Sequence, residues 1–142
     1  MSYCIRLDQF SSNAIAVITE GAGGFLTPLN THEDLGNFAQ QIGLPITLVV
    51  GMKLGCINHA SLTAEAIHLR HLNIADWIGN IIAPEMPFLS ENIETLRAKI
   101  DAPFLGLIPT LPSGLKRLTT AHTLLKRLNL LRSTFSYQRK TP

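Results

Sequence analysis

The chain has 142 residues, a length that suits one domain with a sizeable hydrophobic core. Hydrophobic residues make up 46% and charged residues 15% of it, a composition typical of a sheet covered on both faces or of a domain that also buries a subunit interface. We expect no membrane span, because no apolar run approaches the roughly 18 to 20 residues that one needs, and no secretory signal. Cys4 and Cys56 form no C-x-x-C motif, so we expect a reduced, cytoplasmic protein.

Charge is distributed unevenly along the chain. Residues 1–101 contain all ten acidic residues and five Lys and Arg, a net charge of −5, whereas residues 102–142 contain seven Lys and Arg and no acid, a net charge of +7. This pattern predicts an acidic body over residues 1–112 and a basic, amphipathic helix or tail over residues 113–142. We expect the tail to dock through its leucines, with binding to a membrane or nucleic acid as the alternative.

The first predicted elements are a strand and a helix. Residues 14–19 form a short, continuous apolar run, as expected of a central parallel strand. The helix that follows has Thr31 as its predicted N-cap, with Asp34 three residues later. Gly43 is expected to close this helix, and Pro45 prevents its continuation.

Three more strands are predicted, at residues 45–50, 77–82 and 104–108. Between them lie two helices, one capped by Asn58 and the other by Ser90. Strands that alternate with helices through short connections predict an α/β fold in which helices flank a parallel sheet.

The residues that could bind a ligand or take part in a reaction follow the predicted strands. Because parallel strands bring their carboxyl ends to one edge of a sheet, and ligands bind at that edge, we expect these segments to lie together. They are residues 20–24, 51–58, 80 and 109–111. The sequence therefore predicts a single ligand site there.

Glu20 is the predicted ligand of a metal ion at this site. It follows the first hydrophobic strand, where Mg²⁺ and phosphate oxygens would compensate the charge of its carboxylate. A carboxylate that caps a helix or forms a salt bridge is the alternative. The glycines Gly21, Gly23 and Gly24 favour a phosphate site, because they permit positive φ and close approach of the backbone.

The other candidate residues each have a structural alternative. Residues 54–58 open a helix whose N-terminal amides could hold an anion, or they form an ordinary loop with an Asn cap. Cys56 has no assignable His–Asp partner, so we expect a packed thiol and not a nucleophile. Asn80 could pair with the edge of a base or could shape a turn.

Four segments of the sequence are read together: E-G-A-G-G at 20–24, V-V-G-M-K-L-G-C-I-N-H-A at 49–60, W-I-G-N at 77–80 and L-G-L-I-P at 105–109. In this order they resemble dethiobiotin synthetase, an ATP-dependent P-loop NTPase of biotin synthesis. The resemblance covers roughly residues 14–112. It implies a three-layer α/β/α fold like that of other P-loop NTPases.

The resemblance also implies an ATP site that uses Mg²⁺. The expected ATP-binding residues are Glu20, Gly21, Ala22, Gly23, Asn80, Ile81, Pro109, Thr110 and Leu111. Among them, Glu20 is expected to bind the metal, and Asn80 and Ile81 are expected to contact adenine.

A substrate and a partner follow from the same resemblance. The expected substrate-binding residues are Leu54, Gly55, Cys56, Ile57 and Asn58, which would receive a carboxylate across the subunit boundary of a homodimer. In the family reaction, CO₂ joins 7,8-diaminononanoate as a carbamate. ATP phosphorylates the carbamate, and the ring closes to a cyclic urea with loss of phosphate.

The chain contains no G-x-x-x-x-G-K-[ST] phosphate loop. In the family this loop and a catalytic lysine precede the E-G-A-G-G strand, so the chain resembles an N-terminally truncated, C-terminal half of the family. We therefore assign no catalytic residue and expect the isolated chain to be inactive, and a separate P-loop half could restore activity. The alternative is a non-catalytic dimerisation or interaction module whose basic tail binds a membrane or nucleic acid.

Overall fold

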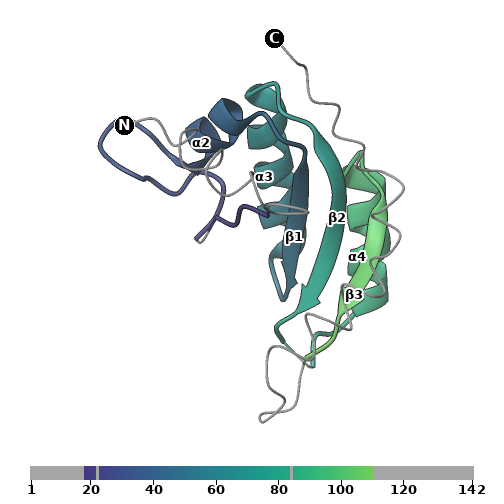
Figure 1. Cartoon of the computed structure of the whole chain (residues 1–142). Coiled ribbons are helices and arrows are strands. Elements are labelled where there is room, and N and C mark those ends of the chain that lie inside the picture. The colour runs from purple at the N-terminus through teal and green to yellow at the C-terminus, as the bar shows by residue number, and fades with distance from the viewer. Residues whose placement is uncertain (1–17, 22, 84, 111–142) are drawn as a thin grey trace. The chain divides into compact units, whose positions relative to one another are not determined.

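A computed structural model of the chain describes residues 18–21, 23–83 and 85–110. The elements are α2 (Leu35–Ile42), β1 (Ile46–Met52), α3 (Cys56–Leu69), β2 (Ile74–Ile81), α4 (Leu89–Lys99) and β3 (Phe104–Ile108). The three strands form one parallel sheet in the order β1-β2-β3 (Figure 1). The predicted α/β class with a parallel sheet and flanking helices is confirmed.

The strands agree with the apolar runs that predicted them. β3 has the predicted bounds, and β1 and β2 differ from the predicted ranges only at their ends. The first predicted strand lies outside the described residues except for Ile18 and Thr19, which have no regular secondary structure. For those two residues the strand prediction is wrong.

Helix α2 begins later than predicted. Its N-cap is Asp34 and not Thr31, because Asp34 and Asn37 form a reciprocal capping box. The Asn37 backbone N–H donates to the Asp34 carboxylate at 2.9 Å, and the Asp34 backbone N–H donates to the Asn37 side chain at 2.8 Å. Gly43 closes the helix in the left-handed conformation, with a φ of 66°, as predicted.

Helices α3 and α4 begin without the predicted side-chain caps. Their N-caps are Gly55 and Phe88, which have left-handed φ values of 89° and 54°. Asn58 and Ser90, the predicted caps, lie inside the helices, so both cap predictions are wrong. At α3 a backbone turn replaces the cap, with the Cys56 N–H donating to the Lys53 carbonyl at 3.0 Å.

The hydrophobic core combines one face of the sheet with α3 and α4. Along β1, Leu48, Val50 and Met52 are buried while Thr47 and Val49 are exposed, as the alternation of a strand requires. The other buried core residues come from α3, β2 and α4, and they are Cys56, Ala60, Ala64, Ile67, Ile74, Trp77, Ile93, Leu96 and Ile100.

Trp77 connects the three strands within this core. It is fully buried, lies beside Leu48 in the register of β1 and β2, and stacks on Phe104 of β3 with the ring centroids 4.3 Å apart. Such a pair stabilises beyond the apolar area that it buries.

Two further expectations from the sequence concern the C-terminal tail and a membrane span. The boundary after residue 112 and the basic tail, residues 113–142, lie outside the described residues. In the described ranges, no helix combines the length and the apolar character that crossing a membrane requires.

The core predicts the stability of a pair of leucine variants. Leu96 is fully buried, so Leu96→Ala should lower the free energy of unfolding by about 2–5 kcal/mol. Leu69→Ala, at a residue that is 80% exposed, should change it by less than about 0.5 kcal/mol. Urea denaturation followed by tryptophan fluorescence would measure both, and equal losses would contradict this core.

Candidate functional site

The carboxyl ends of β1, β2 and β3 form the edge at which the sequence predicts a ligand site. Asn80 pairs in register with Gly51 of β1 and with Ile108 of β3, so it lies at the centre of the sheet near this edge. The Thr110 hydroxyl donates to the Ile81 carbonyl at 3.0 Å. The structure therefore places Asn80 and Ile81, the expected adenine contacts, next to residues 109–110 of the expected ATP-binding loop. Leu111, the last residue of that loop, lies outside the described residues.

The first turn of α3 contributes open backbone donors to the same edge. It contains no acidic residue, and no side chain caps it. Early backbone N–H groups of a helix have no partner within the helix, and together with the helix dipole they favour an anion. Leu54 is 97% exposed just before this turn, and Asn58 is exposed within it. Within segment 54–58 the Cys56 N–H is taken by the Lys53 carbonyl. The backbone N–H groups of Ile57 and Asn58 have no acceptor among the described residues and are the donors left for the predicted role.

Cys56 joins the starts of α3 and α4. Its side chain is buried in the core, and its thiol donates to the Asn92 side-chain carbonyl over a long contact of 3.9 Å. The Asn92 amide in turn donates to the Phe88 carbonyl at 2.7 Å. Cys56 is therefore a packed thiol, as expected, and it positions one helix start against the other.

The glycine turn has positive φ at two of its three glycines. Gly23 and Gly24 have φ values of 93° and 118°, which residues with a Cβ rarely adopt. The Thr27 N–H closes the turn by donating to the Gly24 carbonyl at 3.0 Å. The Glu20 side chain is exposed and has no hydrogen bond or ion pair with any described residue. Ala22 lies outside the described residues.

The contacts of this turn lead to α2 and not to the carboxyl edge. A Cβ built on Gly21 would lie 3.0 Å from a methyl group of Leu35, so the Gly21 backbone packs directly against the first residue of α2. Between described residues, no hydrogen bond joins the turn to Asn80 or to the start of α3. The strand that is expected to carry Glu20 to the edge lies almost entirely outside the described residues.

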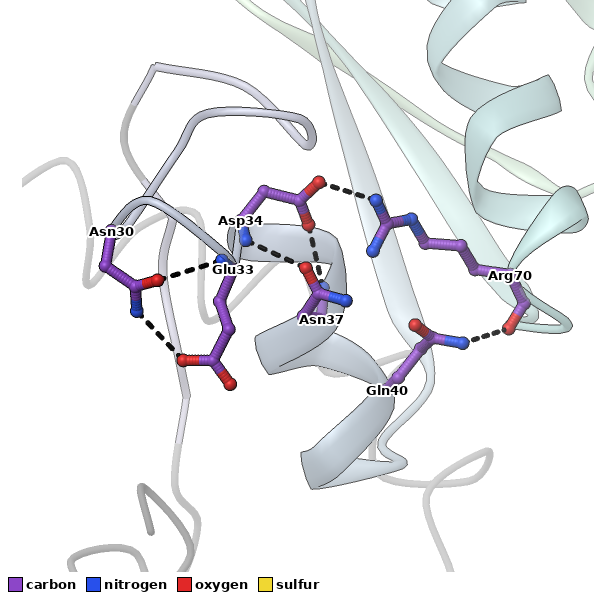
Figure 2. A network of polar contacts seen from close by, with 6 residues as sticks. All are labelled: Asn30, Glu33, Asp34, Asn37, Gln40 and Arg70. Carbon is purple, nitrogen blue, oxygen red and sulfur yellow. Dashed lines mark hydrogen bonds and ion pairs between the residues drawn. The ribbon is translucent and has the colours of Figure 1, made fainter. Parts of the chain in front are cut away.

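Arg70, at the end of α3, is the residue that holds α2. The Arg70 guanidinium pairs with the Asp34 carboxylate at 2.5 Å, and the Arg70 backbone carbonyl accepts a hydrogen bond from the Gln40 side chain at 3.0 Å. Both contacts are drawn in Figure 2. The guanidinium also lies 5.7 Å from the centre of the Phe25 ring, a cation–π distance. Gly36 is buried beneath it, and a Cβ there would come within 2.8 Å of the guanidinium.

The loop before α2 has its own polar network, also visible in Figure 2. The Asn30 side chain accepts hydrogen bonds from the backbone N–H groups of His32 and Glu33 at 2.8 and 2.9 Å, and its amide donates to the Glu33 carboxylate at 2.9 Å. These bonds shape the turn that delivers Asp34 to Arg70.

Neither Arg70 nor Asp34 was predicted as a functional residue. The spacing of Asp34 and Asn37 is that of a capping box and could have identified the true helix start. Nothing in the sequence indicates that Asp34 meets Arg70, which lies 36 positions away.

A metal ion would find only a partial set of ligands here. Within the described ranges, no three His, Cys, Asp or Glu side chains lie close enough together to hold one. Glu20 offers one carboxylate that has no partner among the described residues. This fits Mg²⁺, since that ion commonly takes one or two carboxylates and completes its shell with water and phosphate oxygens.

A pocket of about 390 Å³ opens near the end of α3, away from the carboxyl edge. Its lining residues are Gln40, Gly43, Leu44, Pro45, Arg70, His71, Leu72 and Asn73. None of them is a predicted site residue.

Comparison with known proteins defines the class to which this fold and edge belong. Residues 2–116 match the family model described as an AAA domain, and the chain belongs to that family.

Within the family, the chain is similar to proteins named ATP-dependent dethiobiotin synthetase. It is 51% identical to the one from Ralstonia nicotianae over 116 residues, which are 82% of this chain and 51% of the relative. It is 50% identical to the one from Nitrosospira multiformis, over 71% of this chain and 45% of the relative. It is 51% identical to the one from Aromatoleum aromaticum, over 72% of this chain and 45% of the relative. These matches confirm the predicted resemblance, and the chain spans about half the length of these relatives.

The contact between Asp34 and Arg70 predicts a pH-dependent stability. The hydrogen bond from the Asn37 backbone, followed by the interactions with Arg70, holds the pKa of Asp34 below its ordinary value of 3.8. A carboxyl group whose pKa is lower in the folded than in the unfolded state stabilises the fold at pH values above its unfolded-state pKa. This contribution is lost as the pH falls below 3.8 and through the lower folded-state pKa. The thermal midpoint of wild type should therefore exceed that of Asp34→Asn at neutral pH, and the difference should shrink below pH 3.8.

Glu94→Gln is the matched control for this prediction. It removes a carboxylate from the exposed pair of Glu94 with Arg97, a type of pair that contributes little to stability. Its midpoint should follow that of wild type at every pH. A difference between wild type and Asp34→Asn that does not change with pH would contradict the account.

Proposed function

We propose that these residues supply the adenine, metal and substrate-carboxylate side of an ATP-dependent dethiobiotin synthetase whose phosphate loop comes from sequence outside these 142 residues. The observation that carries this proposal is the identity of 51% over 116 residues with an enzyme of that name. The carboxyl edge supports it, because the expected adenine segment, the loop at 109–110 and the start of α3 all lie at that edge.

In this proposal each segment of the edge has a separate task. Asn80, Ile81 and residues 109–111 contact the base of ATP. The open amides at the start of α3 bind the substrate carboxylate, which complements the positive end of the helix dipole. The glycine turn at 21–24 presents its backbone to the phosphates.

Glu20 is proposed as a ligand of Mg²⁺ in the assembled enzyme. When bound, this ion would neutralise charge on the phosphate oxygens of ATP. The residue itself contributes an exposed carboxylate without a competing cation among the described residues.

The proposed substrates are 7,8-diaminononanoate, CO₂ and ATP. One amine takes up CO₂ as a carbamate, ATP transfers its terminal phosphoryl group to the carbamate oxygen, and the second amine closes the ring as phosphate leaves. Positioning and electrostatic stabilisation do most of the work in phosphoryl transfer. This chain would position the base, the metal and the substrate carboxylate, while the phosphate loop would hold the transferred group.

The proposed assembly includes a homodimer in which the segment 54–58 serves the neighbouring subunit. Leu54 and Phe88 are large apolar side chains, 97% and 71% exposed, and they flank the starts of α3 and α4. Exposed apolar side chains of this kind are consistent with a subunit boundary. The alternative of a basic tail that binds a membrane or nucleic acid concerns residues outside the described ranges.

Reconstitution tests the proposed function. The purified chain alone should show no ATP-dependent formation of dethiobiotin, because the 142 residues contain no phosphate loop. Mixing it with the segment of the Ralstonia relative that it does not cover, including the phosphate loop, should produce dethiobiotin, ADP and phosphate. Turnover by the chain alone, or a stable mixed complex without turnover, would contradict the proposal.

A matched pair of variants tests the role of Glu20 in that mixture. Glu20→Gln should lower kcat/KM for MgATP by at least about tenfold, because a neutral amide binds Mg²⁺ far more weakly than a carboxylate does. Glu65→Gln changes an exposed residue of α3 in the same way and should leave turnover unaffected.

A further inference from the structure

The glycine turn rests on the beginning of α2. Gly21 packs against the Leu35 side chain, and a Cβ on Gly23 would come within 2.9 Å of the Thr27 hydroxyl. The Leu35 N–H donates to the Thr27 carbonyl at 3.0 Å, so these two supporting residues are themselves joined. The conformation of the turn therefore depends on where Thr27 and Leu35 are held.

Leu35 is held through its neighbour Asp34. Asp34 caps α2, forms a bridge with Pro28 and carries the carboxylate that pairs with Arg70. Arg70 approaches the segment before and within α2 at three further points. Its guanidinium lies near the Phe25 ring and the Gly36 backbone, and its backbone carbonyl accepts a hydrogen bond from the Gln40 side chain (Figure 2).

Arg70 is suited to this task by its chemistry and its place. The guanidinium is planar, so it can pair with a carboxylate and lie over an aromatic ring at the same time, which a lysine ammonium cannot do. Its side chain and that of Asp34 are only 23% and 20% exposed, so the pair is less screened by solvent than the exposed pair of Arg97 with Glu94. Arg70 also follows the last turn of α3, a helix with a packed core face.

We propose that Arg70, through Asp34, is a positioning residue for the glycine turn and therefore for Glu20 at the phosphate side of the site. This inference rests on the proposed function for its effect on ATP. The link between Arg70 and the turn stands on the contacts alone. Arg70 touches no reacting group and acts only by fixing α2 and the residues packed on it.

The variants that test this link keep the rest of the structure. Asp34→Asn removes the charge but retains an acceptor for the helix cap, since Asn is as good an N-cap as Asp. Arg70→Met removes both the positive charge and the planar guanidinium, whereas Arg70→Lys retains the charge but not the guanidinium. Glu94→Gln is the control, because it removes a carboxylate from an ion pair on α4.

The first readout is the backbone amide resonances of Gly21, Gly23 and Gly24 in the full chain, measured by NMR. Asp34→Asn and Arg70→Met should shift and broaden these three resonances, the double variant should add little to either single one, and Arg70→Lys should restore them in part. The amides of core residues Ile93 and Leu96 on α4 should not move. Unchanged glycine resonances in both single variants would overturn the link.

The second readout is turnover in the mixture with the phosphate-loop segment. Arg70→Met should raise KM for MgATP about fivefold while kcat stays within about twofold, because a positional coupling of this kind changes affinity by such factors. Arg70→Lys should recover part of the loss. A KM equal to that of wild type, with the wild-type mixture active, would overturn the positioning role and leave the proposed function intact.

Failure of the proposed function gives a different result. If the wild-type mixture does not turn over, the role of Arg70 in placing the phosphate side falls with it, whatever the glycine resonances show.

Discussion

The parallel pairing of β1, β2 and β3 is the constraint on which the rest of the structure depends. Parallel neighbours cannot be joined by a tight turn, so α3 and α4 must return the chain across the sheet before each new strand begins. Both helices consequently start at the carboxyl edge and end at the opposite edge. The predicted adenine contacts and the open amides of α3 meet there because the strand direction leaves them no other place.

The segment before β1 is positioned differently, because no described strand precedes it in the sheet. It is held from outside by Arg70, whose guanidinium contacts Asp34, Phe25 and the Gly36 backbone. One part of the candidate site is therefore fixed by the sheet. The other part is fixed by backbone hydrogen bonds around Thr27 and Leu35 and by the contacts of Arg70 with α2. The second part includes the ion pair of Arg70 with Asp34, and pH and salt act on ion pairs more directly than on apolar packing.

The sequence predicted the elements that local patterns determine and missed those that depend on distant contacts. The apolar runs located all three described strands, and Gly43 marked the end of α2 correctly. The starts of α3 and α4 were missed because Gly55 and Phe88 adopt left-handed conformations that replace a side-chain cap, and a Phe in that conformation has no sequence signal.

The place of the candidate site at the carboxyl edge of the sheet could also be predicted from the sequence. The order of the segments implied a shared carboxyl edge, and the hydrogen bond between Thr110 and Ile81 agrees with it.

The most direct measurement of the central claim is photo-crosslinking of an ATP analogue with an azide on its base to the reconstituted enzyme, followed by peptide mapping. The account predicts label in residues 80–81 or 109–111 that Mg²⁺ and excess ATP prevent. Label confined to the pocket beside Arg70, His71 and Leu72 would contradict it.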